Sequence, residues 1–320
     1  MNTQAHFDQV PVIPYYPDFI PLDINHKDVL HPRLSLTSDG VSEFTFSGLY
    51  LFRNRYNYRI SRNNEADLDY SFVVSGKQLF GKERKKTFFM TPCSVPNPDI
   101  LESLFVTHDY WKNISETLYN QCQQSPIREK LEEIGVVIEE DRDNFDYLYY
   151  RNELAELTGK KFHKKKNHVN NFLNTYPDHE QKPISKELIP AAIKVLDRWQ
   201  ENLILRSEDE DGDYEAAKEA LDKFDTLSLK GSVFFVNRKP AAYCLGESLS
   251  GGRMFAIHFE KAIEDYRGIY QFMNKAFAAS LPRFFTLINR EQDLGSEGLR
   301  QAKMTYRPCG FVKKYTGKKI

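Results

Sequence analysis

Hydrophobic residues change their spacing several times along the first half of the chain, and each change predicts a different element. Between residues 41 and 92, aromatic and β-branched residues are dense enough to predict strands, including EFTFSGLYLF at 43–52. Residues 97–123 instead carry apolar residues at helical spacing behind Asn97 and Pro98, two residues typical of a helix start. The first half is therefore predicted to combine strand hairpins with helices.

The second half shows a similar plan with clearer boundaries. Helical spacing covers 184–206 and 214–227, and a hairpin is predicted at 231–249. Strands and helices then alternate to the end of the chain, at 251–261, 268–281, 284–289, 297–306 and 310–317. A hairpin that leads into a β-α-β-α-β run resembles the order of the GNAT acyltransferase fold. We therefore expect a mixed α/β protein with two GNAT-like domains in tandem, at residues 20–180 and 181–320.

The composition narrows the classes of protein that fit. The 320 residues carry a formal net charge of -1, so any attraction to an anion must be local. The four cysteines have no C-x-x-C or other metal-ligand spacing, and no metal site is expected. The first residues lack the features of a signal peptide, and no window approaches the roughly 18 apolar residues of a membrane-spanning helix. We expect a cytoplasmic protein.

A lysine-rich stretch near the middle of the chain is the first candidate for a binding site. On a helix at 162–176, Lys165 falls inside the apolar stripe of that helix, and Lys166 falls on its edge beside Asn167. A lysine in such a stripe must reach outward to a surface carboxylate or bind an anion, because an unpaired buried ammonium is costly. Both alternatives remain open. The five lysines of the stretch are Lys160, Lys161, Lys164, Lys165 and Lys166.

A second group of polar residues follows the strand predicted at 284–289. Ligands of open α/β sheets bind beyond the carboxyl ends of strands, so Asn289, Glu291 and Asp293 are well placed for chemistry. Arg300 and Lys303 are three residues apart and could hold one anionic group from the same helical face. The alternative is an acidic turn that caps a helix, with surface cations behind it.

These residues define a hypothesis for catalysis. Glu291 or Asp293 is the candidate base, with Tyr147, Tyr149 and Tyr306 as wall or proton-relay groups. The predicted anion-holding groups are Lys165, Lys166, Arg300 and Lys303. A weaker signal lies at Arg267 and Gly268, where a helix start could take a cofactor phosphate on its backbone amides.

Two stretches of the chain resemble the signature blocks of a widespread bacterial family, the phosphatidylglycerol lysyltransferase C-terminal-like domain. They are YLYYRNELAELTGKKFHKKKNHVNNFLNTYP at 147–177 and INREQDLGSEGLRQAKMTYRP at 288–308. The resemblance implies two GNAT-like domains in tandem, as in lysyl-phosphatidylglycerol synthases and Fem-type peptidyltransferases. Those relatives move an aminoacyl group from aminoacyl-tRNA to an amine or hydroxyl. The resemblance also implies that the two blocks line a shared cleft.

The resemblance leaves three functions open. The first is an aminoacyl or acyl transferase that takes its donor from aminoacyl-tRNA. The second is a CoA-dependent N-acyltransferase, although the glycine-rich pyrophosphate loop is reduced here to Arg267-Gly268, and the membrane domain of the lipid enzymes is expected to be absent. The third is a module that binds RNA, such as a tRNA 3′ end, without chemistry. An anionic small molecule is the other expected partner, and the oligomeric state stays open.

Overall fold

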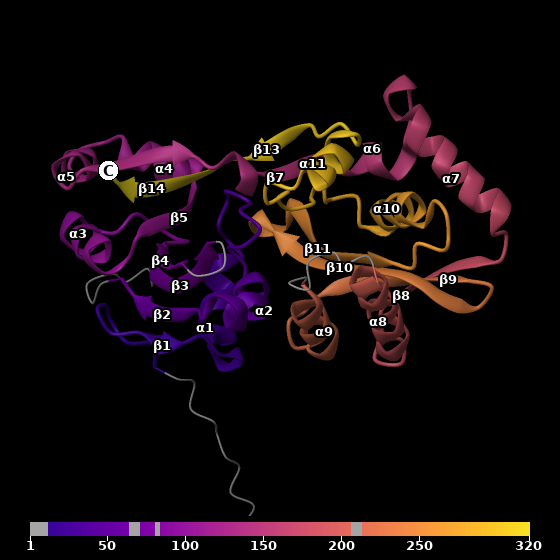
Figure 1. Cartoon of the computed structure of the whole chain (residues 1–320), viewed down its shortest axis with the longest axis horizontal. Helices are drawn as coiled ribbons and strands as arrows, with labels where there is room; N and C mark the ends of the chain where they lie inside the picture. The colour runs from indigo at the N-terminus through magenta and orange to yellow at the C-terminus, as the bar shows by residue number, and fades with distance from the viewer. Residues whose placement is uncertain (1–11, 64–70, 81–83, 206–212) are drawn as a thin grey trace, which may run out of the picture. The chain divides into compact units, whose positions relative to one another are not determined.

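The computed structural model describes residues 12–63, 71–80, 84–205 and 213–320, which form two compact units. The first unit contains the described residues of Met1–Thr37, Phe44–Glu140 and Tyr315–Ile320. The second contains Ser38–Glu43 and Asp141–Lys314. Each unit is built around a seven-stranded sheet with helices against it, so the expected mixed α/β class is confirmed (Figure 1).

The sheet of the first unit has the order β1-β2-β3-β4-β5-β14-β6. Its strands are β1 (Ile20–Pro21), β2 (Arg59–Arg62), β3 (Phe72–Phe80), β4 (Arg84–Met90), β5 (Tyr110–Ser115), β6 (Val136–Glu140) and β14 (Lys314–Lys319). The helices of this unit are α1 (Lys27–Leu34), α2 (Phe46–Tyr56), α3 (Pro98–Thr107), α4 (Glu116–Cys122) and α5 (Ile127–Glu133). Successive side chains of a strand face opposite sides. Phe88 therefore packs on Tyr56 of α2, and Phe89 packs on Phe105 of α3.

The sheet of the second unit has the order β13-β7-β12-β11-β10-β9-β8. Its strands are β7 (Asp146–Tyr150), β8 (His179–Pro183), β9 (Lys230–Val236), β10 (Lys239–Leu249), β11 (Met254–Ala262), β12 (Leu287–Asn289) and β13 (Gly310–Val312). The helices are α6 (Arg151–Glu156), α7 (His163–Thr175), α8 (Ile189–Leu205), α9 (Tyr214–Asp222), α10 (Ile269–Ser280) and α11 (Glu297–Met304). Helices α8 and α9 lie on one side of this sheet, and α7 and α10 lie on the other (Figure 1).

The two sheets have matching strand orders, and two strands have changed places between them. In the first sheet, β14 lies between β5 and β6, although it is the last strand of the chain. In the second sheet, β7 lies in the equivalent position between β12 and β13. Each sheet is thus completed by a strand that a simple tandem order would assign to the other. Neither half of the sequence contains a complete sheet by itself.

This exchange places the boundary between the units away from the expected one at 180/181. The chain passes from the first unit to the second at Glu140–Asp141 and returns at Lys314–Tyr315. Residues 141–180 belong to the second unit because β7 pairs with β12, with Tyr149 opposite Ile288. The rings of Phe172 and Phe272 also stack with their centroids 4.6 Å apart, which fixes α7 against α10.

Three predicted elements differ from the structure. Residues 43–52, expected as a strand, contain the start of α2, because the Thr45 hydroxyl accepts a hydrogen bond from the Gly48 amide as a helix N-cap. Residues 97–123, expected as one helix, are interrupted by the buried strand β5, which contains Trp111. The last expected strand, 310–317, is divided into β13 and β14, which belong to different sheets.

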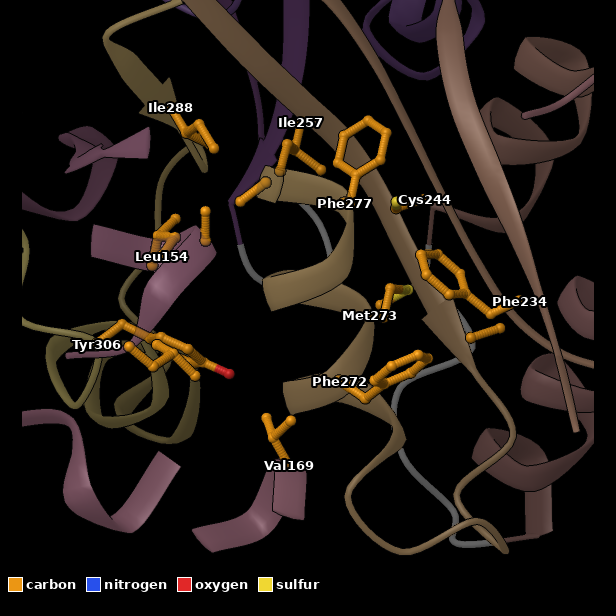
Figure 2. Close-up of a cluster of buried hydrophobic side chains, with 14 of the residues drawn as sticks. Leu154, Val169, Phe234, Cys244, Ile257, Phe272, Met273, Phe277, Ile288 and Tyr306 are labelled. Carbon is orange, nitrogen blue, oxygen red and sulfur yellow. The ribbon is translucent and has the colours of Figure 1, made fainter. Parts of the chain in front are cut away.

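The core of the second unit fixes the lysine-rich helix by its apolar stripe. Phe162, Val169 and Phe172 are buried, as the helical spacing predicts. Figure 2 shows Val169 of α7, Phe272 of α10 and Tyr306 directed into one cluster of buried side chains. Helix α7 is therefore held in a defined rotation, and that rotation decides which of its lysines face the protein.

Candidate functional site

The segment Asn289–Asp293 continues from the end of β12, where β12 runs parallel to β11. Its backbone is held in an unusual shape. Glu291 has a φ of 56°, a left-handed conformation that is uncommon for a residue with a side chain. The Glu291 amide donates a 2.7 Å hydrogen bond to the side-chain oxygen of Asn289. The turn directs successive side chains of this segment toward different partners.

Lys303 stabilises this turn from α11. Its ammonium donates to the backbone carbonyls of Arg290, Glu291 and Gln292, at 2.7, 3.1 and 2.5 Å. Burial, and then the positive charge of Arg290, lower the pKa of Lys303 to about 8. The ammonium of Lys303 is therefore already hydrogen-bonded to backbone carbonyls. The expectation that Lys303 and Arg300 hold one anion together stays a prediction.

Asp293 and Arg300 form an ion pair with each other, in which only the carboxylate is buried. The Asp293 carboxylate is fully buried and accepts two hydrogen bonds from Arg300, both of 2.9 Å, together with one each from the Tyr147 hydroxyl and the Gly295 amide. Burial alone would raise the pKa of Asp293, but these hydrogen bonds hold it well below its usual range. Both oxygens of Asp293 are thus occupied by donors of the chain itself, and its expected role as a base stays a prediction.

The same ion pair changes the roles expected for its neighbours. Arg300 also contacts Asp143 at 2.6 Å, so its guanidinium is occupied by two carboxylates. The Tyr147 hydroxyl donates to Asp293 and accepts from Arg142. In the structure these groups stabilise the turn at 293–300.

Asn289 is likewise engaged with a buried carboxylate. Its side-chain amide donates to Asp146 at 3.1 Å and to the carbonyl of Gly40 at 2.9 Å. Lys314 forms a 2.7 Å ion pair with the same carboxylate, and both charged residues are fully buried. Burial raises the pKa of Asp146 to about 6 against the attraction of the Lys314 ammonium. The side-chain amide of Asn289 therefore stabilises the start of the turn. Its expected role in binding a substrate stays a prediction.

Glu291 is the member of the segment whose carboxylate is most available. His258 of β11 lies between two carboxylates, donating from Nδ1 to Glu291 at 2.7 Å and from Nε2 to Glu247 of β10 at 2.9 Å. The side chains of His258 and Glu247 are 4% and 5% exposed, whereas that of Glu291 is 24% exposed. Burial alone would lower the pKa of His258, but the two carboxylates raise it to about 10. The imidazole is a cation at neutral pH.

A β-bulge aligns this triad. The register between β10 and β11 shifts between Leu245 and Gly246, immediately before Glu247. A Cβ on Gly246 would lie 1.8 Å from the carbonyl oxygen of Ala256, so only glycine permits this approach. Glu247 and His258 were not predicted from the sequence. The available signal was Glu247 in the largely apolar segment AAYCLGESL and His258 after the apolar residues MFAI.

The two sequence blocks meet at the ring of Tyr306. The ammonium of Lys165, from α7, lies 4.0 Å from the centroid of this ring, and the guanidinium of Arg290 lies 4.9 Å from it. Arg290 also forms an ion pair with Glu260 of β11. Burial, and then the charge of Arg290, lower the pKa of Lys165 to about 8. Burial raises the pKa of Tyr306 to about 12, so its hydroxyl keeps its proton.

The other predicted residues lie outside this contact. Lys166, expected on the edge of the apolar stripe, and Asn167 are both exposed on α7. The Tyr149 hydroxyl donates to the carbonyl of Lys303. Arg267 is exposed, and Gly268 has a packing role, since a Cβ there would lie 2.8 Å from the carbonyl oxygen of His168. A cofactor role for Arg267 and Gly268 stays a prediction.

Comparison with known proteins places the chain in a family. Residues 35–317 match the model of the family described as Phosphatidylglycerol lysyltransferase, C-terminal, and the chain belongs to that family. It is 27% identical over 188 residues to an uncharacterized protein of Mycoplasmoides gallisepticum, and this match covers 58% of each protein. The chain thus spans about three fifths of the length of that relative. In the parts of the chain that are described, no helix is long and apolar enough to cross a membrane.

Solved structures confirm the fold. A conserved protein of unknown function from Bacteroides thetaiotaomicron is 28% identical, with a TM-score of 0.77 over 94% of this chain and 99% of that one. The C-terminal domain of a proposed lysylphosphatidylglycerol synthetase from Agrobacterium fabrum is 12% identical, with a TM-score of 0.58 over 93% and 92%. FemX is 8% identical, with a TM-score of 0.51 over 95% and 97%. The chain shares with these structures a fold that here consists of two mixed α/β units, each with a seven-stranded sheet.

Proposed function

We propose that the chain is a transferase that moves an aminoacyl group from aminoacyl-tRNA to an amine or hydroxyl acceptor. Family membership and the tandem GNAT-like fold support a group-transfer enzyme. The observation that carries the proposal is Glu291. Its carboxylate is partly exposed at the end of a parallel strand pair, and one of its oxygens is fixed by a buried imidazolium. Among the described residues, the second oxygen has no hydrogen-bond partner.

This geometry suits a general base. The free oxygen of Glu291 accepts the proton that the acceptor amine or hydroxyl loses as it attacks the carbonyl carbon of the aminoacyl ester. The carbon–oxygen bond to the tRNA ribose then breaks, and the leaving hydroxyl takes up the proton. His258 and Glu247 are positioning residues, because they hold Glu291 without reaching the reacting atoms. The fixed left-handed turn at Glu291 adds to this preorganisation.

The exposed side of α7 supports an RNA donor. Lys160, Lys164 and Lys166 are exposed on or beside this helix, and Lys165 on the same helix reaches Tyr306. Phosphate neutralisation by lysines releases counterions, so tRNA affinity should fall steeply with salt. A flat salt titration would argue for a donor other than RNA.

The decisive experiment compares Glu291→Gln with the wild-type protein in a transfer assay. The donors are tRNA charged with labelled amino acids and, separately, acetyl-CoA, and the acceptors are phosphatidylglycerol vesicles and amino-terminal dipeptides. We expect transfer from aminoacyl-tRNA, with kcat about 10²- to 10⁴-fold lower in the variant and tRNA affinity unchanged. Glu297→Gln, an exposed carboxylate in the first turn of α11, is the control and should behave as wild type.

Three outcomes would contradict the proposal. Equal turnover by Glu291→Gln and wild type would remove Glu291 from the chemistry. Transfer from acetyl-CoA alone would replace the aminoacyl donor with a CoA thioester. Tight tRNA binding without transfer to any acceptor would instead identify a binding module.

A further inference from the structure

Positive charge is in excess around Tyr306. Arg290 and Lys165 lie against its ring, and the carboxylate of Glu260 forms an ion pair with Arg290. Glu291 and Glu247 both pair with the imidazolium of His258, and neither carboxylate forms an ion pair with Lys165 or Arg290 among the described residues. Buried or half-buried cations without counter-charges are costly, and Glu260 is the ion-pair partner of Arg290 alone, so about one positive charge beside Tyr306 is unmatched. An anion bound here would match it.

Arg290 has hydrogen-bonding capacity left for such an anion. Its side chain is 11% exposed, and one of its terminal nitrogens is bonded to Glu260. The other two guanidinium nitrogens, Nε and Nη1, are buried without a hydrogen-bond partner. Nearly all buried polar groups in proteins are satisfied, so two free donors on one buried arginine indicate a missing acceptor. Asn274 holds the other oxygen of Glu260, which fixes the ion pair in place.

Lys165, on helix α7, is a second cation beside Tyr306, and the described residues give it no counter-charge. Among the described residues its ammonium contacts the Tyr306 ring and forms no ion pair. The apolar stripe of α7 is buried on both sides of it in sequence, at Phe162 and Val169, so the helix cannot turn Lys165 away without exposing its core face. Two cations that each lie within 5 Å of one ring centroid repel each other. An anion near both would offset this repulsion.

We propose that Arg290 and Lys165 form an oxyanion subsite beside Tyr306, and that it binds a phosphate group of the substrate. A planar guanidinium with two free donors, together with the Lys165 ammonium, suits the several oxygens of a phosphate. The subsite lies next to Glu291 in sequence and would place a phosphorylated substrate at the proposed transfer site. The placement of a substrate for transfer rests on the proposed function. The binding of phosphate at the subsite does not, because it needs no transfer reaction.

The test measures binding of inorganic phosphate to the full chain by calorimetry at pH 7, with ionic strength held constant by sodium chloride. Lys165→Met and Lys166→Met are the matched variants. They are adjacent on one helix and remove the same charge, but only Lys165 contacts Tyr306. We expect saturable phosphate binding that is weakened about tenfold or more by Lys165→Met and less than about twofold by Lys166→Met.

A stability readout distinguishes the subsite from general charge effects. Without phosphate, Lys165→Met should melt at a higher temperature than wild type, because the variant removes a half-buried cation beside Arg290. Phosphate should then raise the melting temperature of the wild type and of Lys166→Met, but not that of Lys165→Met. Arg290→Lys, which keeps the charge and removes the planar donors, should also lose the phosphate effect.

Three results would overturn the subsite. These are equal weakening by the two lysine variants, acetate binding as tightly as phosphate, and no saturable phosphate binding by the wild type. Because these measurements involve no turnover, their failure can be told apart from failure of the transfer reaction. Phosphate binding with an inactive Glu291 would retain the subsite and reject the chemistry.

Discussion

His258 separates two carboxylates that could not otherwise lie so near each other in the protein interior. Glu247 and Glu291 each bind one nitrogen of its ring, at 2.9 and 2.7 Å. Removing one partner from a buried ionic group leaves uncompensated charge and costs about 3–5 kcal/mol. The same histidine therefore supports both the stability of the second unit and the orientation of the proposed base.

We predict that His258→Gln destabilises the protein by about 3–5 kcal/mol near pH 6.5, measured by urea unfolding. The folded pKa of His258, about 10, is above its ordinary value of 6.5, so its stabilising effect is complete below pH 6.5 and is lost as pH rises toward 10. The stability gap between wild type and variant should therefore narrow over that range. His163→Gln, an exposed histidine, should show no gap at any pH. A constant gap for His258→Gln would contradict the imidazolium.

Comparing wild type with variant is necessary because other groups titrate in the same range. Lys165 and Lys303 have pKa values lowered to about 8, so their charged forms destabilise the folded state, and this penalty is relieved as pH rises above 8. Both lysines are present in wild type and in His258→Gln. Their contributions cancel in the difference, which then reports His258.

At the level of elements, the position of Lys165 depends on how closely α7 approaches α10. Gly268 precedes α10 with a φ of 90°, and a Cβ there would lie 2.8 Å from the backbone oxygen of His168 and 3.2 Å from the Cβ of Phe172. The glycine thus allows both the left-handed start of α10 and the contact with α7. Any residue with a side chain would push the two helices apart.

We predict that Gly268→Ala destabilises the protein by about 2 kcal/mol or more and weakens phosphate binding, because α7 and Lys165 must move outward. Gly159→Ala is the matched control. Gly159 also has a positive φ, 83°, but nothing lies within 4 Å of its Cβ position, so only the backbone strain of about 1 kcal/mol applies. Urea unfolding and phosphate calorimetry measure the two effects. Equal losses in the two variants would mean that close packing at Gly268 has no separate role.

Local patterns in the sequence predicted those elements whose burial follows a simple period. The stripe of α7 is an example, since Phe162, Val169 and Phe172 are all buried where helical spacing places them. The same reasoning failed at 43–52, where aromatic content favours a strand. There a single N-cap at Thr45 and the buried spacing of Phe46 and Leu49 select a helix instead.

The candidate site was predictable only where its residues are close in sequence. The 288–308 block drew attention to Glu291 and Tyr306, and the lysine helix drew attention to Lys165. The partners of these residues come from elsewhere in the chain. His258 and Glu247 reach Glu291 through the pairing of β10 with β11, and no local period indicates that register. Asp293 and Arg300 looked like free functional groups because their mutual ion pair depends on a turn that the sequence does not reveal.

At the scale of the whole molecule, the exchange of β7 and β14 means that each sheet contains a strand from the other half of the sequence. Strand β13 pairs with β7 in the second sheet, and β14 pairs with β6 in the first, although a single residue separates β13 from β14. A strand between two neighbours satisfies backbone hydrogen bonds on both of its edges. The loss of β14 would therefore open the first sheet internally and leave the strand pairs of the second sheet intact.

We predict that removal of Tyr315–Ile320 unfolds part of the first unit and leaves the second folded. The truncation retains Lys314, so the buried ion pair with Asp146 in the second unit is preserved. Hydrogen exchange read by mass spectrometry should show loss of protection at β5 and β6, the neighbours of β14, with wild-type protection at β10 and β11. Removal of Ile320 alone, whose side chain is 98% exposed, is the control.

The same truncation separates the roles of the two units. Phosphate binding by Arg290 and Lys165, and the Glu291–His258–Glu247 triad, use residues of the second unit. Phosphate affinity should therefore survive the truncation even where protection at β5 is lost. Wild-type protection at β5 and β6 would show that the first sheet does not need β14. Loss of protection at β10 and β11 would show instead that the second unit cannot fold without a complete first sheet.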